Sequence, residues 1–296
     1  MEPSIADRRY PEPEARALAL GLAAVAGWAT VATAFKLGLT RLEPAQLLLA
    51  GTVCSAAIFA VAATAQGAWR ISPRALAAAA GFGLLNPVLY YLVLFEAYQR
   101  LPAQVAQPLN YTWTIVLALL AVPVLGQPLT RRMLAGVLIS YAGVLLVISR
   151  GSLGGWHDLD ALGIALALAS TLLWAGYWLG NARWTEPPLT LMCWSFLLAV
   201  PVLAGVCWLG PGWPPLTAHT LGYGVWVGAL EMGVTFLLWQ RALRLTRRAA
   251  RLGQLVLITP FLSLVLIATV LGETVHSSAV LGLTVIVAGI WVSRQG

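Results

Sequence analysis

The feature that most constrains this chain is a series of apolar runs, each about 20 residues long, that recurs along its whole length. As an α-helix rising about 1.5 Å per residue, such a run crosses a hydrocarbon core about 30 Å thick. The chain is 59% hydrophobic and only 10% charged, which excludes an ordinary soluble domain. The sequence therefore predicts an all-α membrane protein with ten transmembrane helices, over residues 17–36, 44–66, 75–99, 102–122, 129–149, 159–182, 188–209, 218–243, 248–270 and 276–293.

The segments between these runs are short and rich in turn residues, such as "TEPP" at 185–188 and "GPGWPP" at 210–215. None of them is long enough to hold a soluble domain. Residues 1–16 are polar, rich in proline and mixed in charge, unlike a cleaved signal peptide. We expect them to form a cytoplasmic N-terminal tail.

The distribution of basic residues predicts how the chain lies in the membrane, because Lys and Arg accumulate on the cytoplasmic side. Ten spans place both termini on one side, and of the 18 Lys and Arg residues only Lys36, Arg41, Arg100 and Arg150 fall on the other. We therefore expect both termini in the cytoplasm of a bacterial-type inner membrane. The net charge of +7 then indicates contact with anionic lipid rather than with nucleic acid.

The chain also repeats itself at an offset of 145 to 146 residues. This offset places Trp28 over Trp174, and "LGQPLTRRMLAGVLISYAGVLLVISRG" (125–151) over "LGETVHSSAVLGLTVIVAGIWVSRQG" (271–296). We divide the chain into a first repeat at 17–150 and a second at 151–296. Five spans per repeat is an odd number, so the two repeats are inverted, as in transporters whose midplane site opens alternately to either side.

Several of these features resemble the EamA type of the drug/metabolite transporter superfamily. They are the "LGxxLT…G…G" ending of each half, the tryptophan midway along its first helix, Lys36 closing the first helix, and the five-plus-five plan. The resemblance covers essentially the whole chain after residue 16. Within that family, the chain is most similar to exporters of aromatic amino acids. Thr114 stands where the family usually has a mid-helix proline, and Gln127 where it commonly has Glu, which suggests a specialised pocket.

One carboxylate, Glu231, lies inside the apolar run 225–244. A charge facing lipid at mid-helix costs roughly 2.5–3.5 kcal/mol on insertion scales, so we expect Glu231 to face inward. The repeat offset places it over Asn86. Three roles remain open: binding a cationic or zwitterionic solute, carrying a coupling proton, or bonding a neighbouring helix.

The fourth predicted span carries polar residues along one side. At 100° per residue, five side chains fall within an arc of about 120°, with Trp113 at its margin: Gln104, Gln107, Asn110, Tyr111 and Thr114. Such a strip lines water or substrate, or alternatively bridges helices through hydrogen bonds.

Aromatic residues near the middle of the spans point to the same region. Trp28 and Trp174 lie mid-helix, away from the interfacial belt, and Tyr90 and Tyr91 follow a predicted break at Asn86-Pro87. Singly each is typical of packing, but together they indicate an aromatic-lined pocket. The predicted substrate-binding residues are Trp28, Asn86, Tyr90, Gln107, Asn110, Tyr111, Trp113, Trp174 and Glu231, with Glu231 also the candidate for proton coupling.

No enzyme or nucleotide motif is present, and the three histidines and three cysteines lack metal-site spacing. We therefore expect no catalysis, cofactor or metal, and a gradient as the driving force. The predicted partner is a small solute, an amino acid, and the predicted function is its export. The alternative is an exporter of drugs or cationic compounds, and the alternative from another class is a membrane receptor or an intramembrane enzyme. We expect a monomer, with a dimer as the alternative.

Overall fold

The computed structural model describes residues 11–126, 128–152, 158–181, 184–246, 252 and 255–294, and all regular structure in these ranges is helical. The all-α prediction is therefore confirmed for this part of the chain. Most of the predicted tail, Gln127 and the start of the ninth predicted span lie outside it.

Eight helical stretches of the described residues are long and apolar enough to cross a membrane. They are built from α1 (Pro11–Ala29) with α2 (Val31–Leu39), α3 (Pro44–Gln66), α4 (Pro73–Gly83) with η2 (Leu84–Leu89) and α5 (Tyr90–Arg100), α6 (Ala103–Tyr111) with α7 (Trp113–Leu125), α8 (Arg131–Ser149), α9 (Ala161–Asn181), α10 (Pro188–Leu209), and α11 (Ala218–Val227) with η4 (Gly228–Gly233) and α12 (Val234–Leu245). Two shorter apolar helical stretches follow, η5 (Val256–Ile258) with α14 (Thr259–Val270), and α15 (Ser277–Ser293). They occupy the places of the ninth and tenth predicted spans, and the count of ten stays a prediction.

The first helix begins at Pro11 rather than at residue 17, so the end of the expected tail is helical. Proline is accepted in the first turn of a helix, because the N–H groups there have no partner within the helix. The helix therefore starts before the apolar run does, and the cytoplasmic tail stays a prediction.

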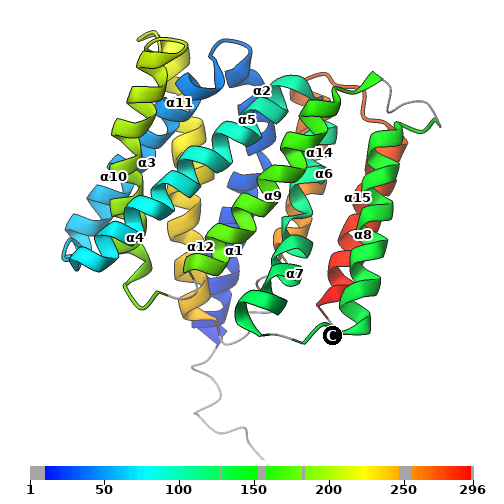
Figure 1. The fold of residues 1–296 in the computed structure, drawn as a ribbon, viewed down its shortest axis with the longest axis horizontal. Coiled ribbons are helices and arrows are strands. Elements are labelled where there is room, and N and C mark those ends of the chain that lie inside the picture. The colour runs from blue at the N-terminus through cyan, green and yellow to red at the C-terminus, as the bar shows by residue number, and fades with distance from the viewer. Residues whose placement is uncertain are drawn as a thin grey trace, which may run out of the picture.

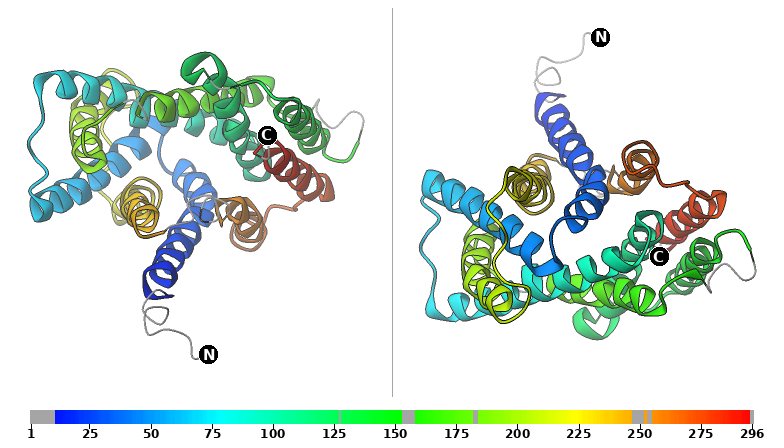
Figure 2. Two further views of the ribbon diagram at one scale, coloured as in Figure 1. Left: turned by 90° about the horizontal axis from the view of Figure 1, so that it is seen from below. Right: turned by 90° about the horizontal axis from the view of Figure 1, so that it is seen from above.

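The helices lie side by side as one bundle, with α1 beginning and α15 ending at the same end of it (Figure 1). We call this the basic end, because α8, which starts with Arg131, begins there and α15, which is followed by Arg294, ends there; the connection from α3 to α4, which carries Arg70, lies on the same side. Viewed from either end, α8 and α15 form a pair at one edge, and α3, α4 and α10 lie at the opposite edge (Figure 2). Between these edges, α1 packs on α12, and both α5 and α7 pack on α9.

Two long helices are interrupted by π-helical turns at equivalent places in the two halves. Asn86 lies in η2 with φ −147° and ψ 114°, followed by Pro87, which has no N–H to donate. Glu231 lies in η4, which ends at Gly233. The repeat offset therefore brings together two real interruptions, and π turns inside α-helices frequently occur at functional sites.

Glycines allow α8 and α15 to approach closely. A Cβ atom added to Gly136 would lie 2.5 Å from the Gly289 carbonyl oxygen, and one added to Gly143 would lie 2.6 Å from that of Gly282. Between these contacts, the Ser140 hydroxyl donates to the Ile286 carbonyl at 3.0 Å. The paired glycines of the two repeats thus serve packing within the chain.

We expect Gly143→Val to destabilise the protein by about 1–3 kcal/mol, since the new side chain meets backbone atoms of α15 that cannot turn away. The change would be measured as a lower Tm in detergent. Gly205→Val is the matched control, because Gly205 is also helical but has open space around its Cβ position. Equal Tm values for the two variants would contradict this account of the α8–α15 contact.

Candidate functional site

A cavity of about 760 Å³ lies between the two halves, within the range of small-molecule sites. Its lining comes from helices of both halves, including α1, α5, α6, α7, α9 and α12. Eight of the nine predicted binding residues line it: Trp28, Tyr90, Gln107, Asn110, Tyr111, Trp113, Trp174 and Glu231.

Asn86 is the exception, since it is 1% exposed and is not among the described residues that line the cavity. Its η2 segment packs against α9 and α10, and the dihedral angles at the kink turn the chain at Asn86 itself. The predicted break at Asn86-Pro87 is therefore present, but the pairing of Asn86 with Glu231 in the repeat does not give Asn86 a place in the cavity lining.

Trp174 is the centre of an aromatic cluster on one wall of the cavity. It stacks on Tyr90 with ring centroids 4.5 Å apart and on Tyr177 at 5.7 Å. Trp113 approaches Trp174 edge-on at 6.2 Å. Rings arranged this way present both faces and edges to a flat apolar group.

A second aromatic group lies beside Glu231 and includes two residues that the sequence did not suggest. Trp28 lies 5.5 Å from Trp239 and 6.0 Å from Phe236, measured between ring centroids, and all three line the cavity. In a regular α-helix, Phe236 and Trp239 would lie about 140° and 80° around the axis from Glu231. The π turn adds one residue and brings them toward the same face. Recognising that turn was the signal that sequence reasoning lacked.

The Glu231 carboxylate accepts a hydrogen bond from the Tyr91 hydroxyl at 2.8 Å. Within the described part of the chain, no basic side chain forms an ion pair with it. A carboxylate held in a largely apolar cavity without a counter-charge favours binding either a proton or a cation.

In the polar strip of the fourth span, some side chains hydrogen-bond to a neighbouring helix and others line the cavity. Asn110 donates to the Ser170 hydroxyl at 2.9 Å and so bridges α6 and α9. Gln107 lines the cavity, and its buried Oε1 atom has no hydrogen-bond partner among the described residues. The strip therefore contains both a residue that bridges helices and one that lines the cavity, and its contact with substrate stays a prediction.

Gln104, from the same strip, instead helps to close the end of the bundle opposite the basic end. Its amide donates to the Thr274 carbonyl at 2.9 Å and accepts from the His276 backbone N–H at 2.9 Å. The Glu273 carboxylate accepts from the backbone N–H of Ala103 at 2.9 Å. Contacts between the first half and the 273–276 segment thus seal this end.

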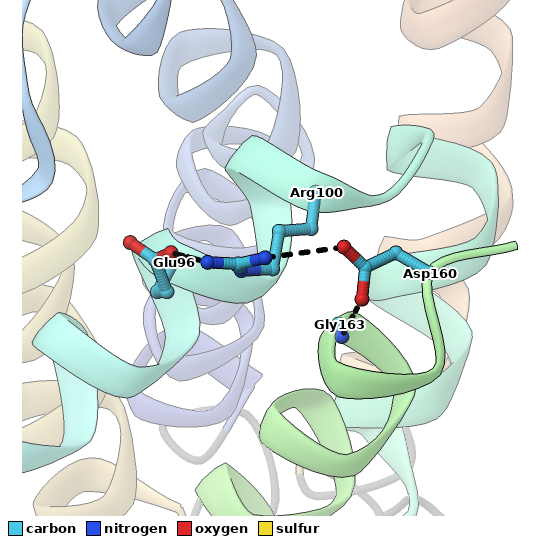
Figure 3. A network of polar contacts seen from close by, with 4 residues as sticks. All are labelled: Glu96, Arg100, Asp160 and Gly163. Atoms are coloured by element: carbon cyan, nitrogen blue, oxygen red, sulfur yellow. Dashed lines mark hydrogen bonds and ion pairs between the residues drawn. The ribbon is translucent and has the colours of Figure 1, made fainter.

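The sealed end also carries an exposed charge network (Figure 3). Arg100 lies between Glu96 and Asp160, with N–O distances of 2.7 and 3.1 Å. The Gly163 N–H and then the Arg100 guanidinium hold the pKa of the Asp160 carboxyl below its usual value. Exposed ion pairs contribute little stability, so this network mainly aligns α5 with α9.

At the basic end, by contrast, the cavity reaches the ends of the helices. Leu125, Met133, Ser293 and Arg294 line it there, and Leu125 is exposed. The cavity therefore reaches the basic end, whereas the residues that line it toward the sealed end, Phe35, Leu94 and Tyr98, are buried.

Comparison with known proteins identifies the family. The model of the EamA-like transporter family matches residues 15–149 and again residues 161–295. A protein of Salmonella typhimurium strain LT2, named probable amino-acid metabolite efflux pump, is 28% identical over 94% of both chains. An uncharacterized transporter of Archaeoglobus fulgidus is 30% identical over 51% of this chain and 52% of its own.

A solved crystal structure shares the fold, with a TM-score of 0.66 and 21% identity over 94% of this chain and 97% of the other. The relatives are transporters, and the described residues contain several apolar helices long enough to span a membrane, so the chain is a multi-pass membrane transporter. Because the two matches of the family model together cover most of the sequence, the chain belongs to the EamA-like transporter family.

Proposed function

We propose that this transporter exports amino acids, aromatic ones included, by alternating access to the central cavity. The observation that carries the proposal is the Glu231 carboxylate, which lies in an aromatic cavity without a basic partner among the described residues. The efflux pump of Salmonella typhimurium, named for amino-acid metabolites, supports the same substrate class.

The cavity offers a partner for each part of an amino acid. Glu231 attracts the ammonium group, and Gln107 and Tyr111 offer donors for the carboxylate. The indole rings of Trp28 and Trp174 pack on the side chain of the substrate. Because these groups are already held by the bundle, little ordering accompanies binding.

For the topology, we propose ten spans in two inverted repeats, with both termini in the cytoplasm of an inner membrane. The paired interruptions at η2 and η4 support the repeat, and the arginines at the basic end support the orientation. The cavity then extends toward the cytoplasm, and export requires the contacts between Gln104 and the 273–276 segment to separate.

A second candidate is export of organic cations. It is favoured by the position of Glu231 beside the Trp28 and Trp239 rings, because aromatic faces and a carboxylate together attract a cation. In both cases Glu231 is also the group that would carry a coupling proton.

The test is uptake of radiolabelled tryptophan, phenylalanine, threonine and a lipophilic cation into proteoliposomes, with and without a pH gradient. We expect saturable uptake of the amino acids above that of empty liposomes. Uptake that depends on the gradient would support coupling through Glu231, whereas uptake without it indicates facilitated diffusion. Uptake of the cation alone would overturn the amino-acid proposal in favour of the second candidate.

A further inference from the structure

Two helix interruptions, one in each half of the sequence, lie next to each other in the bundle. The first separates α1 from α2 at Thr30, and the second begins where α11 meets η4 at Gly228. In the bundle α11 packs on α2, and α1 packs on η4 and α12. The segment that carries Glu231 is therefore in contact with both sides of the Thr30 interruption.

Two tryptophans connect these interruptions reciprocally. Trp28, just before the first interruption, donates its indole N–H to the backbone carbonyl of Glu231 at 3.2 Å. Trp226, just before the second, donates its indole N–H to the Thr30 hydroxyl at 2.8 Å. Each of the two interrupted helices thus supplies an indole N–H that donates a hydrogen bond to the interruption in the other helix.

The Thr30 hydroxyl both donates and accepts a hydrogen bond in this arrangement. It accepts from Trp226 and donates to the Gly27 carbonyl at 2.8 Å, so it joins the end of α1 to α11. A hydroxyl has one donor hydrogen, and the geometry around Thr30 gives that hydrogen a partner inside its own helix. Valine has nearly the same shape but offers neither bond.

The backbone at Glu231 is held from two sides. Its carbonyl accepts from Trp28 and also from the Thr235 hydroxyl at 3.0 Å. Gly27 lets these segments meet, because a Cβ atom there would lie 2.5 Å from the Thr235 methyl carbon. The place of the Glu231 carboxylate between Tyr91 and the aromatic rings therefore depends on how α1 is seated.

We propose that Thr30 and Trp226, which do not line the cavity, are positioning residues for Glu231. Their hydrogen bond seats α1 so that Trp28 holds the Glu231 backbone, and this places the carboxylate to receive the substrate ammonium. The inference rests on the proposed function for its transport consequences, but the placement of Glu231 is measurable without any substrate.

The first measurement is the rate at which a hydrophobic carbodiimide modifies Glu231, followed by mass spectrometry of its peptide. The Trp226–Thr30 bond is partly buried. Loss of one such hydrogen bond costs roughly 1 kcal/mol, which is a factor of about five in the equilibrium between the ordered and the loosened site. We expect Thr30→Val and Trp226→Phe each to raise the rate of Glu231 modification about fivefold, because the loosened carboxyl is more accessible. The double variant should match Thr30→Val, because that change already removes the only bond that Trp226→Phe removes.

Two further variants separate positioning from a general loss of structure. Thr30→Ser keeps the hydroxyl and should retain the wild-type rate. Trp208→Phe, at a side chain that is 71% exposed on α10, should also leave the rate unchanged. Effects of Thr30→Val and Trp226→Phe that add, or rates that stay at the wild-type value, would overturn the proposal.

The second measurement compares tryptophan with indole-3-propionate, which lacks the ammonium group. We expect the two variants to raise the KM for tryptophan about fivefold with little change in kcat, and to leave indole-3-propionate unaffected. An equal rise for both compounds would overturn the positioning role. If the wild-type protein carried no amino acid, the proposed function would fail, while the carbodiimide rates would still decide the placement of Glu231.

Discussion

Glu231→Gln is expected to raise the KM for tryptophan roughly 30-fold, which corresponds to about 2 kcal/mol of a charge-assisted hydrogen bond. The amide has nearly the shape of the carboxylate and can still accept from the Tyr91 hydroxyl. The variant therefore removes the charge and keeps the packing. The measurement is concentration-dependent uptake into proteoliposomes, with the Tm of the variant as a check on folding.

Glu96→Gln is the matched control, because Glu96 is also a carboxylate on a membrane helix but belongs to the exposed network at the sealed end. It should leave the KM nearly unchanged. A cation exporter would respond differently to Glu231→Gln, by losing transport of the lipophilic cation while still carrying neutral solutes. Unchanged flux of every solute in the Glu231 variant would remove Glu231 from the site.

Trp113→Ala is expected to weaken transport of tryptophan and phenylalanine about tenfold more than that of threonine. Trp113 lines the cavity and is partly exposed, and its ring meets Trp174 edge-on at 6.2 Å. Loss of a large apolar contact costs a bulky substrate about 1.5 kcal/mol, the low end for a side chain that is only partly buried, whereas a small substrate never makes that contact. The measurement is the ratio of kcat/KM values for the three amino acids.

Two further variants test whether the effect of Trp113→Ala comes from the loss of an aromatic ring at this position. Trp113→Phe keeps an aromatic face and should retain most of the preference for bulky substrates. Trp208→Ala removes an exposed ring remote from the cavity lining and should leave the ratio as in the wild type. An equal loss for tryptophan and threonine in Trp113→Ala would show a general defect rather than a lost substrate contact.

Much of the site was accessible from the sequence because membrane helices obey strong physical rules. Polar groups such as Glu231 and Gln107 are costly in lipid, so placing them inside required no knowledge of the neighbouring helices. The Asn86-Pro87 pair predicted the break in the third span, and helical spacing gathered Gln107, Asn110 and Tyr111 on one side of the fourth span. The role of these residues in binding is still a prediction.

Other residues were placed wrongly or missed because their positions depend on the deviations from a regular helix. Asn86 turns out of the cavity at its kink, and Phe236 and Trp239 turn into it after the η4 turn. Gln104 shares a helix face with Gln107, yet it meets the 273–276 segment near the end of the bundle. A constant angle per residue describes neither the changes of register at Asn86 and η4 nor the depth of Gln104 along its helix.

By itself, the sequence determined the class of this protein, its membrane-spanning helices and the doubled plan of the chain. The length and hydrophobicity of each run decide whether it can cross a lipid bilayer, and the repeat is visible by comparing the two halves of the sequence. The tertiary structure alone decided which polar groups share one cavity, which end of that cavity is sealed, and that the Trp28 indole bonds the Glu231 backbone. These features depend on contacts between helices up to 203 residues apart in sequence, and only packing determines which side chains meet there.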